Sequence, residues 1–252
     1  MKKNVFDLSG KNAVVTGASR GLGKSFAESL ANAGANIIII DTIHNPETEQ
    51  AIRSYGVSCE TYQFDLANFD QYSDLVEKII TKYQHIDILV NNAGIQRRHP
   101  SVDFPKADWD LVLNINLNAV FFMCQAFGRH MLERGYGKII NIASLLAFQG
   151  GFTIPAYTAA KSAVSGFSKS LSNEWASKGV NINCIAPGYI ATEMNTALMN
   201  DETRNRQILE RIPAGRWGNP EDLGGAAVFL ASPASDYING FTIAVDGGWL
   251  GR

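Results

Sequence analysis

Short apolar runs rich in β-branched residues alternate along the chain with amphipathic segments of helical period. Residues 12–16 (NAVVT) and 36–41 (NIIIID) are two such runs, and the amphipathic segment 24–35 lies between them. Continuous apolar runs are typical of strands that are buried on both faces of a parallel sheet. A strand, a helix and a second strand of these lengths suit a right-handed crossover unit. The pattern therefore predicts an α/β fold.

The same alternation continues to the end of the chain and predicts seven strands. We interpret as strands the runs at residues 12–16, 36–41, 59–65, 87–92, 137–144, 180–188 and 240–248. The predicted helices cover residues 24–35, 47–55, 69–84, 108–135, 157–171 and 221–232. No linker rich in proline or serine and no repeat of fixed period interrupts the alternation. We therefore predict one doubly wound, Rossmann-type domain over residues 1–252, with a seven-stranded parallel sheet flanked by helices.

The segment 192–219 does not fit this alternation. It is polar, contains methionines, and lies between a predicted strand and a predicted helix. Long insertions into compact domains are commonly lids or binding loops, although a surface insertion without a function is the alternative. We predict a substrate lid.

Composition and charge exclude several classes of protein. Of the 252 residues, 46% are hydrophobic and 18% are charged, as in ordinary globular proteins. A net charge of −2, with no basic cluster longer than Arg97–Arg98, argues against a nucleic-acid partner. Three cysteines and four histidines are scattered without metal-ligand spacing, so we expect no metal and reduced, mostly buried thiols. No signal peptide and no run long enough to span a bilayer is evident, so we expect a cytoplasmic protein without a membrane partner.

Three glycines follow the first strand in the pattern Gly17-x-x-x-Gly21-x-Gly23. Glycines between a strand and a helix let backbone amides approach a pyrophosphate, although the same pattern alone could form any tight turn. Asp41 ends the second strand, where a carboxylate accepts hydrogen bonds from an adenosine ribose and repels a 2′-phosphate. Arg20 in the glycine turn could instead bind that phosphate. We expect NAD as the cofactor and keep NADP as the alternative.

Tyr157 and Lys161 are four residues apart in a segment of helical period, and Ser144 precedes the tyrosine by thirteen residues. Positions i and i+4 of a helix lie on the same face, so the phenol and the ammonium are expected to be neighbours. A fixed cation favours the phenolate and would bring the tyrosine pKa from about 10 toward neutral pH. The pair thus suits general acid/base chemistry, although a packed tyrosine beside a solvated lysine has the same spacing.

These motifs together resemble the short-chain dehydrogenase/reductase family. The resemblance rests on TGASRGLG, NNAG, the Asn116 of NINLNAVF, Ser144, YTAAK and the APG of IAPGYIAT, and it covers essentially the whole chain. It implies that Tyr157 exchanges a proton with the substrate oxygen and that Lys161 lowers the tyrosine pKa and binds the nicotinamide ribose. It also implies that Ser144 polarises the substrate carbonyl or alcohol and that Asn116 positions a water in the proton relay.

The resemblance further implies a cofactor site and an assembly. Asp65 is expected at the adenine edge, and Ile190 and Thr192 at the carboxamide of the nicotinamide. The full set of expected cofactor residues is Gly17, Ser19, Arg20, Gly21, Leu22, Gly23, Asp41, Asp65, Leu66, Asn92, Ala93, Gly94, Tyr157, Lys161, Pro187, Gly188, Ile190 and Thr192. Members of this family commonly form tetramers through elements like residues 221–232 and 240–248, so we expect a homotetramer.

Three features concern the substrate. Arg97 and Arg98 follow the NNAG motif, and two guanidinium groups at a cleft suit bidentate binding of a carboxylate, although a solvated pair is the alternative. Gln149 and the adjacent glycines 150–151 offer a polar contact and room for a hydroxylated ligand. These features favour a small sugar acid, so we expect its contacts to come from Arg97, Arg98, Ser144, Gln149 and Tyr157.

Closer resemblance points to the same substrate class. IPAGRWG, SLLAFQGG and the C-terminal segment are similar to enzymes of this family that act on 2-dehydro-3-deoxy-D-gluconate, whereas NNAGIQRRHP is equally similar to gluconate 5-dehydrogenases. A ketoacyl-type reductase would need a basic surface for an acidic carrier protein, and none is evident. A non-catalytic dinucleotide sensor is the alternative from another class, and it would usually have lost Tyr157 or Lys161.

Overall fold

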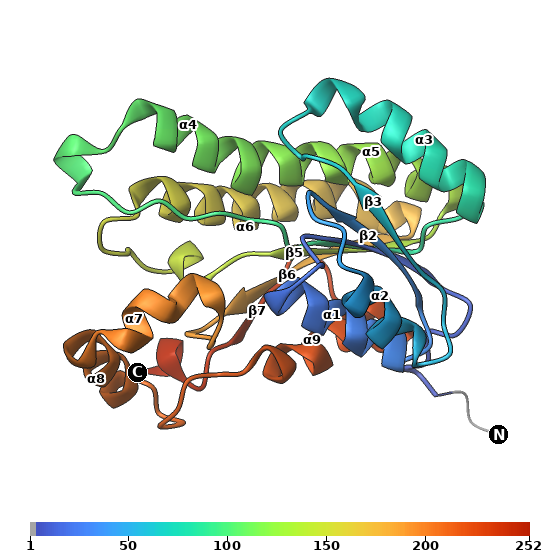
Figure 1. Cartoon of the computed structure of the whole chain (residues 1–252). Helices are drawn as coiled ribbons and strands as arrows, with labels where there is room; N and C mark the ends of the chain where they lie inside the picture. Colours follow the sequence, from blue (N-terminus) through green and yellow to red (C-terminus); the bar gives the residue numbers. More distant parts are fainter. Residues whose placement is uncertain (1–3) are drawn as a thin grey trace.

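A seven-stranded, entirely parallel sheet forms the centre of the molecule (Figure 1). The computed structural model describes residues 4–252. The strands are β1 (Asn12–Thr16), β2 (Asn36–Asp41), β3 (Cys59–Gln63), β4 (Ile88–Asn91), β5 (Gly137–Ile142), β6 (Val180–Pro187) and β7 (Thr242–Val245). Their order across the sheet is β3-β2-β1-β4-β5-β6-β7, and every neighbouring pair is parallel. The predicted doubly wound α/β fold is confirmed.

Helices cover both faces of the sheet (Figure 1). On one face lie α1 (Gly21–Asn32), α2 (Pro46–Arg53) and α9 (Gly224–Ala231). The other face is covered by α3 (Tyr72–Tyr83), α4 (Lys106–Leu113), α5 (Ala119–Arg134) and α6 (Pro155–Trp175). The predicted insertion folds mainly into two further helices, α7 (Thr196–Asn200) and α8 (Glu202–Arg211), which lie to one side of the layers beside the C-terminus.

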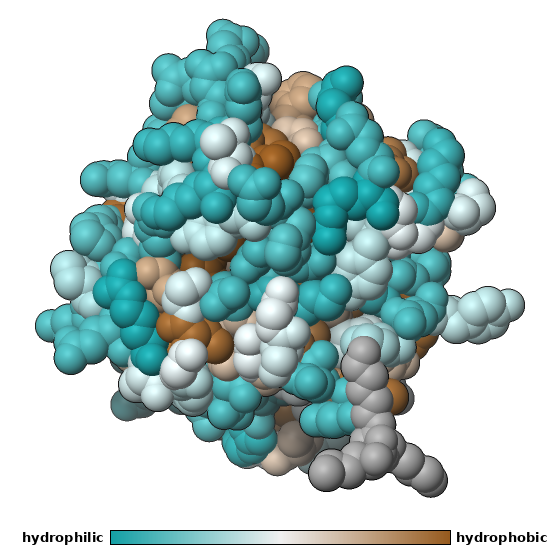
Figure 2. All heavy atoms as spheres, turned by 90° about the vertical axis from the view of Figure 1, so that its right-hand side faces the viewer, coloured by the Kyte–Doolittle hydropathy of each residue, from teal (hydrophilic) through white to brown (hydrophobic). Residues whose placement is uncertain are grey.

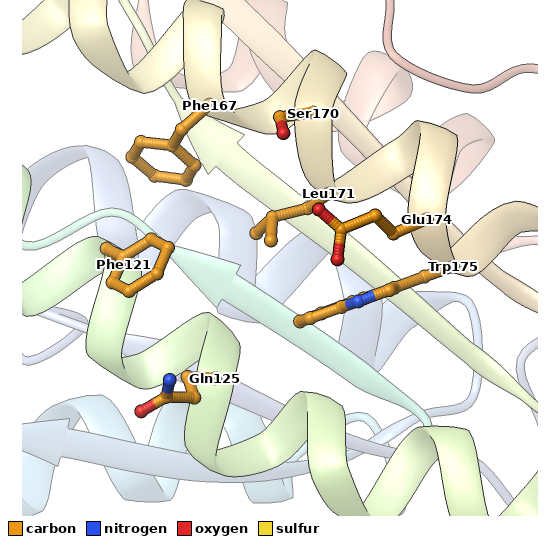
Figure 3. A pocket seen from close by; sticks show the side chains of 7 residues that line it. All are labelled: Phe121, Gln125, Phe167, Ser170, Leu171, Glu174 and Trp175. Carbon is orange, nitrogen blue, oxygen red and sulfur yellow. The ribbon is translucent and has the colours of Figure 1, made fainter.

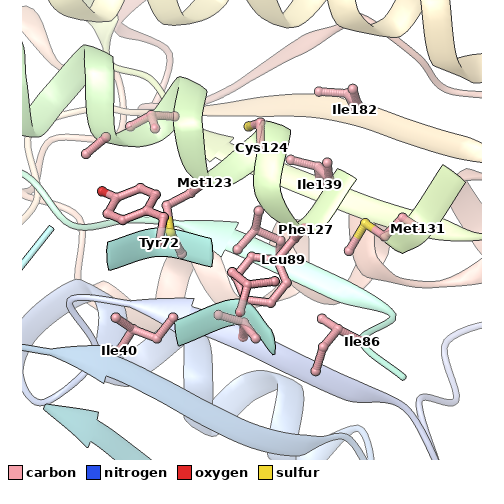
Figure 4. Packing of buried hydrophobic residues seen from close by; sticks show 14 of the residues in the cluster. Ile40, Tyr72, Ile86, Leu89, Met123, Cys124, Phe127, Met131, Ile139 and Ile182 are labelled. Atoms are coloured by element: carbon pink, nitrogen blue, oxygen red, sulfur yellow. The ribbon is translucent and has the colours of Figure 1, made fainter. Parts of the chain in front are cut away.

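The core consists of two layers because successive strand residues point to opposite faces of the sheet. Val14 lies in the layer under α3, α5 and α6, whereas its neighbours Ala13 and Val15 lie in the layer under α1 and α9. In the first layer, Phe127 and Met123 of α5 are fully buried against the sheet (Figure 4). Strands buried on both faces explain why the sequence shows continuous apolar runs.

The helix predicted over residues 108–135 differs from the structure in two respects. It begins at Lys106 and contains a π-helical turn at Asn114–Asn118, between α4 and α5. Inside this turn, the Asn116 side chain donates a hydrogen bond of 2.9 Å to the carbonyl of Val112, four residues earlier. In a regular helix that carbonyl accepts from a backbone amide, so the side chain competes with the helical ladder. Apolar periodicity does not reveal such a turn.

Other boundaries shift by a few residues. The helix predicted from residue 24 begins at Gly21, the strand predicted to residue 65 ends at Gln63, and the last strand covers only Thr242–Val245. The helix predicted over residues 221–232 is α9 preceded by a short 3₁₀ turn at Pro220–Leu223. Helix and strand ends are set by local capping and pairing, which apolar patterns specify weakly.

The strand order places a ligand site between β1 and β4. Chain order runs outward from β1 through β2 to β3 on one side and from β4 to β7 on the other. In open α/β sheets, ligands bind outside the carboxyl ends of the strands where the order reverses. The glycine turn follows β1 and the NNAG motif begins at the end of β4, so both lie at this edge.

Within residues 4–252, one helical stretch, Lys106–Arg134, is long and apolar enough to pass for a membrane span by length and composition. Core helices meet the same criterion, and Cys124 and Phe127 in this stretch are fully buried against the sheet. Seen from the right-hand side of Figure 1, the surface is mostly hydrophilic, with hydrophobic residues in small separate patches (Figure 2). Packing in the core accounts for the apolar character of this stretch.

Candidate active site

The turn between β1 and α1 has the shape of a phosphate-binding turn. Gly17 and Gly21 have φ angles of +64° and +58°, which glycine adopts readily. A Cβ atom on Gly23 would lie 2.1 Å from the Gly17 carbonyl oxygen, so the first turn of α1 packs directly on the glycine turn. The first turn of α1 contains no acidic side chain, and helix N-termini favour anions. These residues fit a dinucleotide pyrophosphate.

The NNAG motif holds the glycine turn in place. The Asn92 side chain donates hydrogen bonds to the carbonyls of Thr16 (3.0 Å) and Gly17 (3.1 Å). The backbone amides of Asn92 and Ala93 both donate to the Thr16 hydroxyl at 3.0 Å. Both side-chain N–H groups of Asn92 are therefore used within the protein, and this residue shapes the cofactor edge. Thr16, which was not among the expected site residues, joins β1 to β4 through these contacts.

Asp41 lies against the glycine turn, as the expected ribose contact should. Its carboxylate accepts hydrogen bonds from the backbone amides of Ser19 (2.9 Å) and Ile43 (3.2 Å). Arg20 forms an exposed ion pair of 3.2 Å with Glu193 at the start of the insertion. Asp41 and Arg20, the two residues considered in the sequence analysis for the choice between NAD and NADP, thus have different partners.

The other expected cofactor residues lie just beyond the carboxyl ends of the strands. Asp65 follows β3 and accepts a hydrogen bond of 2.9 Å from the backbone amide two residues on. Leu66 and Ile190 are buried in the two core layers, so only their backbone atoms are available to a ligand. Residues 187–188 end β6, and Thr192 precedes a 3₁₀ turn in the insertion. Leu22 packs against the core at the first turn of α1.

Helix α6 brings the proposed acid/base pair to the end of β5. Lys161 is 3% exposed, and its ammonium donates a hydrogen bond of 2.5 Å to the carbonyl of Ile142, the last residue of β5. The same ammonium lies 5.6 Å from the centre of the Tyr157 ring. Ser144 follows β5 by two residues, and its hydroxyl forms a hydrogen bond with Tyr157. Three residues that are distant in sequence thus meet at one edge of the sheet.

Burial dominates the titration of this pair. Burial raises the pKa of Tyr157 to about 12, while the Ser144 hydrogen bond and the positive charge of Arg98 act in the opposite direction. The residue as a whole is partly exposed, so this desolvation concerns the hydroxyl end of the ring. Burial also lowers the pKa of Lys161 to about 8. The predicted shift of the tyrosine pKa toward neutral pH is therefore wrong for the chain by itself, because desolvation outweighs the effects of Ser144 and Arg98.

Asn116 is completely buried and clamps the loop after β4. Its side-chain oxygen accepts from the amide of Ile95 (3.1 Å), and its N–H groups donate to the carbonyls of Ile95 and Val112, both at 2.9 Å. A Cβ atom on Gly94 would lie 2.6 Å from the Asn116 oxygen, so the NNAG motif packs against it. The side-chain amide is fully used, which leaves backbone atoms for any contact with a relay water.

The two adjacent arginines have different surroundings. The Arg97 guanidinium lies 3.5 Å from the carboxylate of Asp108 in α4. Arg98 donates a hydrogen bond of 3.5 Å to the carbonyl of Phe152, in the loop before α6. Burial lowers the pKa of Arg98, and the phenols of Tyr189 and Tyr157 act in the opposite direction, so these rings lie near it. Of the two arginines, Arg98 is the one whose positive charge acts on the phenol of Tyr157.

Gln149 connects three segments. Its side-chain oxygen accepts hydrogen bonds from the indole N–H of Trp249 (3.0 Å) and from Arg211 of α8 (3.3 Å). Trp249 is buried near the C-terminus, and its ring lies 4.6 Å from that of Tyr189. The expected contact of Gln149 with substrate therefore depends on its amide N–H groups, since the oxygen already has two donors.

Sequence reasoning missed a cluster of aromatic residues near this edge and one arginine of the insertion. Tyr189 packs against both Trp217 and Trp249. Tyr189 directly follows the APG motif, and this position was a usable signal. Arg204 affects the pKa of Arg98 and so lies near it, but the insertion contains several arginines and nothing in their spacing singles this one out.

Two surface hollows are formed without the residues of the proposed acid/base site. One, of about 260 Å³, is formed between α5 and α6 by Phe121, Gln125, Phe167, Ser170, Leu171, Glu174 and Trp175 (Figure 3). The other, of about 370 Å³, is formed by Gln207, Glu210, Arg211 and Arg252, beside α8 and the C-terminus. Neither hollow is lined by Tyr157, Lys161 or Ser144, so the catalytic edge is identified by its chemistry and its place on the sheet.

Comparison with known proteins agrees with this geometry. A family model described as enoyl-(acyl carrier protein) reductase matches residues 17–250. The chain belongs to the short-chain dehydrogenase/reductase family. It is 52% identical over 252 residues to the 2-dehydro-3-deoxy-D-gluconate 5-dehydrogenase of Bacillus subtilis, covering 99% of this chain and 98% of that one.

More distant relatives within this family are also named as dehydrogenases of sugar acids. The gluconate 5-dehydrogenase of Gluconobacter oxydans is 45% identical over 249 residues, with 97% and 96% of the two chains covered. A crystal structure of gluconate 5-dehydrogenase from Burkholderia cenocepacia, in complex with NADP and tartrate, superposes with a TM-score of 0.94 at 43% identity, covering 98% of both chains. The predicted family and enzyme class are confirmed.

The buried ammonium generates a prediction about stability. Because the pKa of Lys161 falls from its ordinary value near 10.5 to about 8 in the folded protein, the unfolded chain binds more protons between these values. The contribution of the Lys161 side chain to the free energy of unfolding should therefore rise as the pH increases from about 8 to 10.5. Relative to Lys161→Met, wild type should gain up to about 3 kcal/mol over this range, as measured by urea unfolding.

Lys169→Met is the matched control, because Lys169 is exposed on the same helix. The difference in free energy of unfolding between this variant and wild type should be the same at every pH. A difference that is likewise independent of pH for Lys161→Met would contradict the lowered pKa.

Proposed function

We propose that the chain interconverts a keto group and a hydroxyl group on a small sugar acid, with 2-dehydro-3-deoxy-D-gluconate and its 2,5-diketo form as the reactant pair. The observation that carries the proposal is the convergence of Tyr157, Ser144 and Lys161 at one sheet edge, with the Arg98 guanidinium beside the tyrosine. The relatives that act on this sugar acid cover nearly the whole chain, at 47% to 52% identity.

In reduction, Tyr157 serves as the proton donor to the substrate oxygen. A phenol whose pKa lies well above neutrality holds its proton at pH 7 and can give it to an oxygen that becomes an alkoxide. The Ser144 hydroxyl, which is hydrogen-bonded to the phenol in the chain by itself, turns its one O–H to the same substrate oxygen when substrate binds and orients it. When bound, the nicotinamide cofactor supplies or accepts the hydride.

Lys161 has two proposed roles, which are to restore the proton of Tyr157 and to bind the nicotinamide ribose of the cofactor. Its pKa of about 8 puts it near ambient pH, so the ammonium can lose and regain a proton and thereby restore that of Tyr157. Asn116 positions the loop after β4 through its three side-chain hydrogen bonds, and its backbone would hold a water of this relay.

Gluconate 5-dehydrogenase activity is the second candidate. It is favoured by the similarity of the NNAGIQRRHP loop and by relatives from Gluconobacter oxydans and Escherichia coli at 43% to 45% identity. The identities near 50% with 2-dehydro-3-deoxy-D-gluconate enzymes support the first candidate more strongly. A non-catalytic dinucleotide sensor is disfavoured because Tyr157 and Lys161 are both present.

We propose NAD(H) as the preferred cofactor. Asp41 lies at the tip of β2, and two backbone amides hold its carboxylate, so a 2′-phosphate there would meet a fixed negative charge. Arg20, the residue that could bind such a phosphate, is paired with Glu193. NADP(H) is the alternative, because solved relatives from Agrobacterium tumefaciens, Beutenbergia cavernae and Burkholderia cenocepacia contain NADP.

We further propose a cytoplasmic homotetramer. β7 is an edge strand, and next to it Tyr237 is fully exposed and Phe241 is 61% exposed. The hollow between α5 and α6 offers a second apolar face, which includes Phe121 and Phe167 (Figure 3). Two separate faces are what a tetramer with dihedral symmetry requires. The three cysteines are free and buried, as predicted, which suits a reducing compartment.

The enzymatic proposal is tested with a substrate panel and one variant. Purified protein should oxidise 2-dehydro-3-deoxy-D-gluconate with a higher kcat/KM than gluconate, as followed by NADH absorbance. Tyr157→Phe should lose at least about a hundredfold in kcat, because the proton donor is absent, while its affinity for NADH in a fluorescence titration stays unchanged. Full turnover by Tyr157→Phe would exclude this mechanism. A higher kcat/KM for gluconate would make gluconate 5-dehydrogenase the favoured activity instead.

The cofactor proposal is tested by changing charge at β2. Asp41→Asn should raise kcat/KM for NADPH relative to NADH by about tenfold or more, because it removes the repelling carboxylate and keeps the shape of the side chain. Arg20→Gln should leave the wild-type preference for NADH in place. If wild type prefers NADPH and Arg20→Gln abolishes that preference, Arg20 selects the cofactor and the NAD proposal fails.

The assembly is tested by light scattering at micromolar concentration. Wild type should have about four times the 27.4 kDa mass of one chain. Phe241→Glu should lower this mass by burying a charge in the contact, whereas Tyr55→Glu, at an exposed aromatic residue beyond α2, should not. A monomeric wild type would refute the tetramer.

A further inference from the structure

Two arginines at the catalytic edge have no carboxylate partner. Within residues 4–252, six arginines lie within ion-pair distance of an aspartate or glutamate, and Arg98 and Arg204 are not among them. Their hydrogen bonds go to neutral groups, the Phe152 carbonyl for Arg98 and the Gln207 side chain for Arg204. Both guanidinium groups therefore keep their full charge for a ligand.

Both arginines lie against the same residue of the catalytic loop. Arg98 donates to the Phe152 carbonyl at 3.5 Å, and the Arg204 guanidinium carbon lies 5.9 Å from the centre of the Phe152 ring. Phe152 is 81% exposed and belongs to the loop that connects Ser144 to Tyr157. Burial is the main cause that lowers the pKa of Arg98, and the positive charge of Arg204 adds to it. Two like charges from distant parts of the chain thus converge at Phe152, and Arg98 also acts on the phenol of Tyr157.

Helix α8 holds Arg204 in this place. Ile208 and Ile212 are buried with Leu145 and Trp249, so one face of the helix is docked next to the loop that follows Ser144. Arg211 stacks on the Trp249 ring at 4.0 Å, and the Asp201 side chain caps the helix by accepting from the Arg204 amide at 3.0 Å. Arg204 therefore projects from a fixed backbone.

A bound carboxylate would relieve the repulsion between the two arginines. Like charges in a partly desolvated place disfavour each other, and an anion between them offsets that cost. Guanidinium groups also match the two oxygens of a carboxylate geometrically. Arg97 cannot contribute in the same way because Asp108 already neutralises it.

We propose that Arg98 and Arg204 together form the carboxylate-binding subsite for the sugar acid, with Arg204 supplied by the insertion. The subsite rests on the proposed function and gives the insertion a chemical role, because the acid group of the substrate bridges α8 to the loop after β4. Arg97 lies outside the subsite.

The test compares Arg98→Gln and Arg204→Gln with two matched controls. Arg97→Gln removes the neighbouring charge, and Arg206→Gln removes an exposed charge from the same helix. Steady-state kinetics are measured with the sugar acid and with its neutral amide, and tartrate, a dicarboxylate, is titrated by calorimetry into the cofactor-saturated enzyme. Arg204→Gln should raise KM for the acid by about 10- to 100-fold with little change in kcat, and should weaken tartrate binding similarly.

The amide separates charge recognition from a general loss of function. Wild type should prefer the acid to its amide, both Arg98→Gln and Arg204→Gln should lose most of that preference, and both controls should keep it. If Arg98→Gln does not fold, Arg98→Lys replaces it. This variant should lose part of the preference for the acid, because lysine keeps the charge but cannot bind a carboxylate with two parallel N–H groups.

Two results would overturn the subsite, namely an unchanged preference in Arg204→Gln or an equal loss in Arg97→Gln. Failure of wild type to turn over any sugar acid would refute the proposed function instead. In that case tartrate binding still decides whether Arg98 and Arg204 hold a carboxylate.

Discussion

The buried ammonium of Lys161 is the interaction on which the rest of the site depends. A charge that is 3% exposed is costly, and here a hydrogen bond ties it to the last carbonyl of β5. This bond fixes α6 against the sheet edge close to Ser144, the proposed catalytic serine. Any outward movement of α6 would break the bond and carry Tyr157 away from Ser144, so the geometry of the acid/base pair follows from the position of one nitrogen.

A network of buried polar side chains between the sheet and α6 also holds this helix in position. Asn91 of β4 donates to Asn141 of β5 (2.8 Å), and Asn141 donates to Ser168 of α6 (2.9 Å). Cys184 of β6 contacts the same serine at 3.3 Å. Ser168 lies seven residues after Lys161, close to two helical turns along the same face. Apolar packing alone tolerates small shifts of a helix, whereas a chain of directional bonds between four elements permits one alignment.

The apolar pattern predicted the sheet because two-sided burial leaves a strong signal in each strand. The same pattern could not reveal the π turn at Asn114–Asn118, since apolar periodicity there fits a continuous helix. It also could not tell Arg97 from Arg98, because adjacent residues in an irregular loop have no period and Asp108 decides between them. The sign of the tyrosine pKa shift was wrong for a related reason. Spacing shows which charges are neighbours, but desolvation depends on everything packed around them.

The proposed catalytic and substrate-binding residues come from different parts of this chain. Tyr157 and Lys161 lie on α6 and Ser144 just after β5, two elements whose positions the core fixes, whereas the proposed carboxylate contact comes partly from α8, outside the layers. What makes α8 precise enough for recognition is its docking through Ile208 and Ile212 onto Trp249, a residue next to the C-terminus. Trp249 would thereby support the proposed carboxylate subsite without touching the substrate. A family fold can change its substrate by altering such an insertion and its anchor while the sheet edge keeps its chemistry.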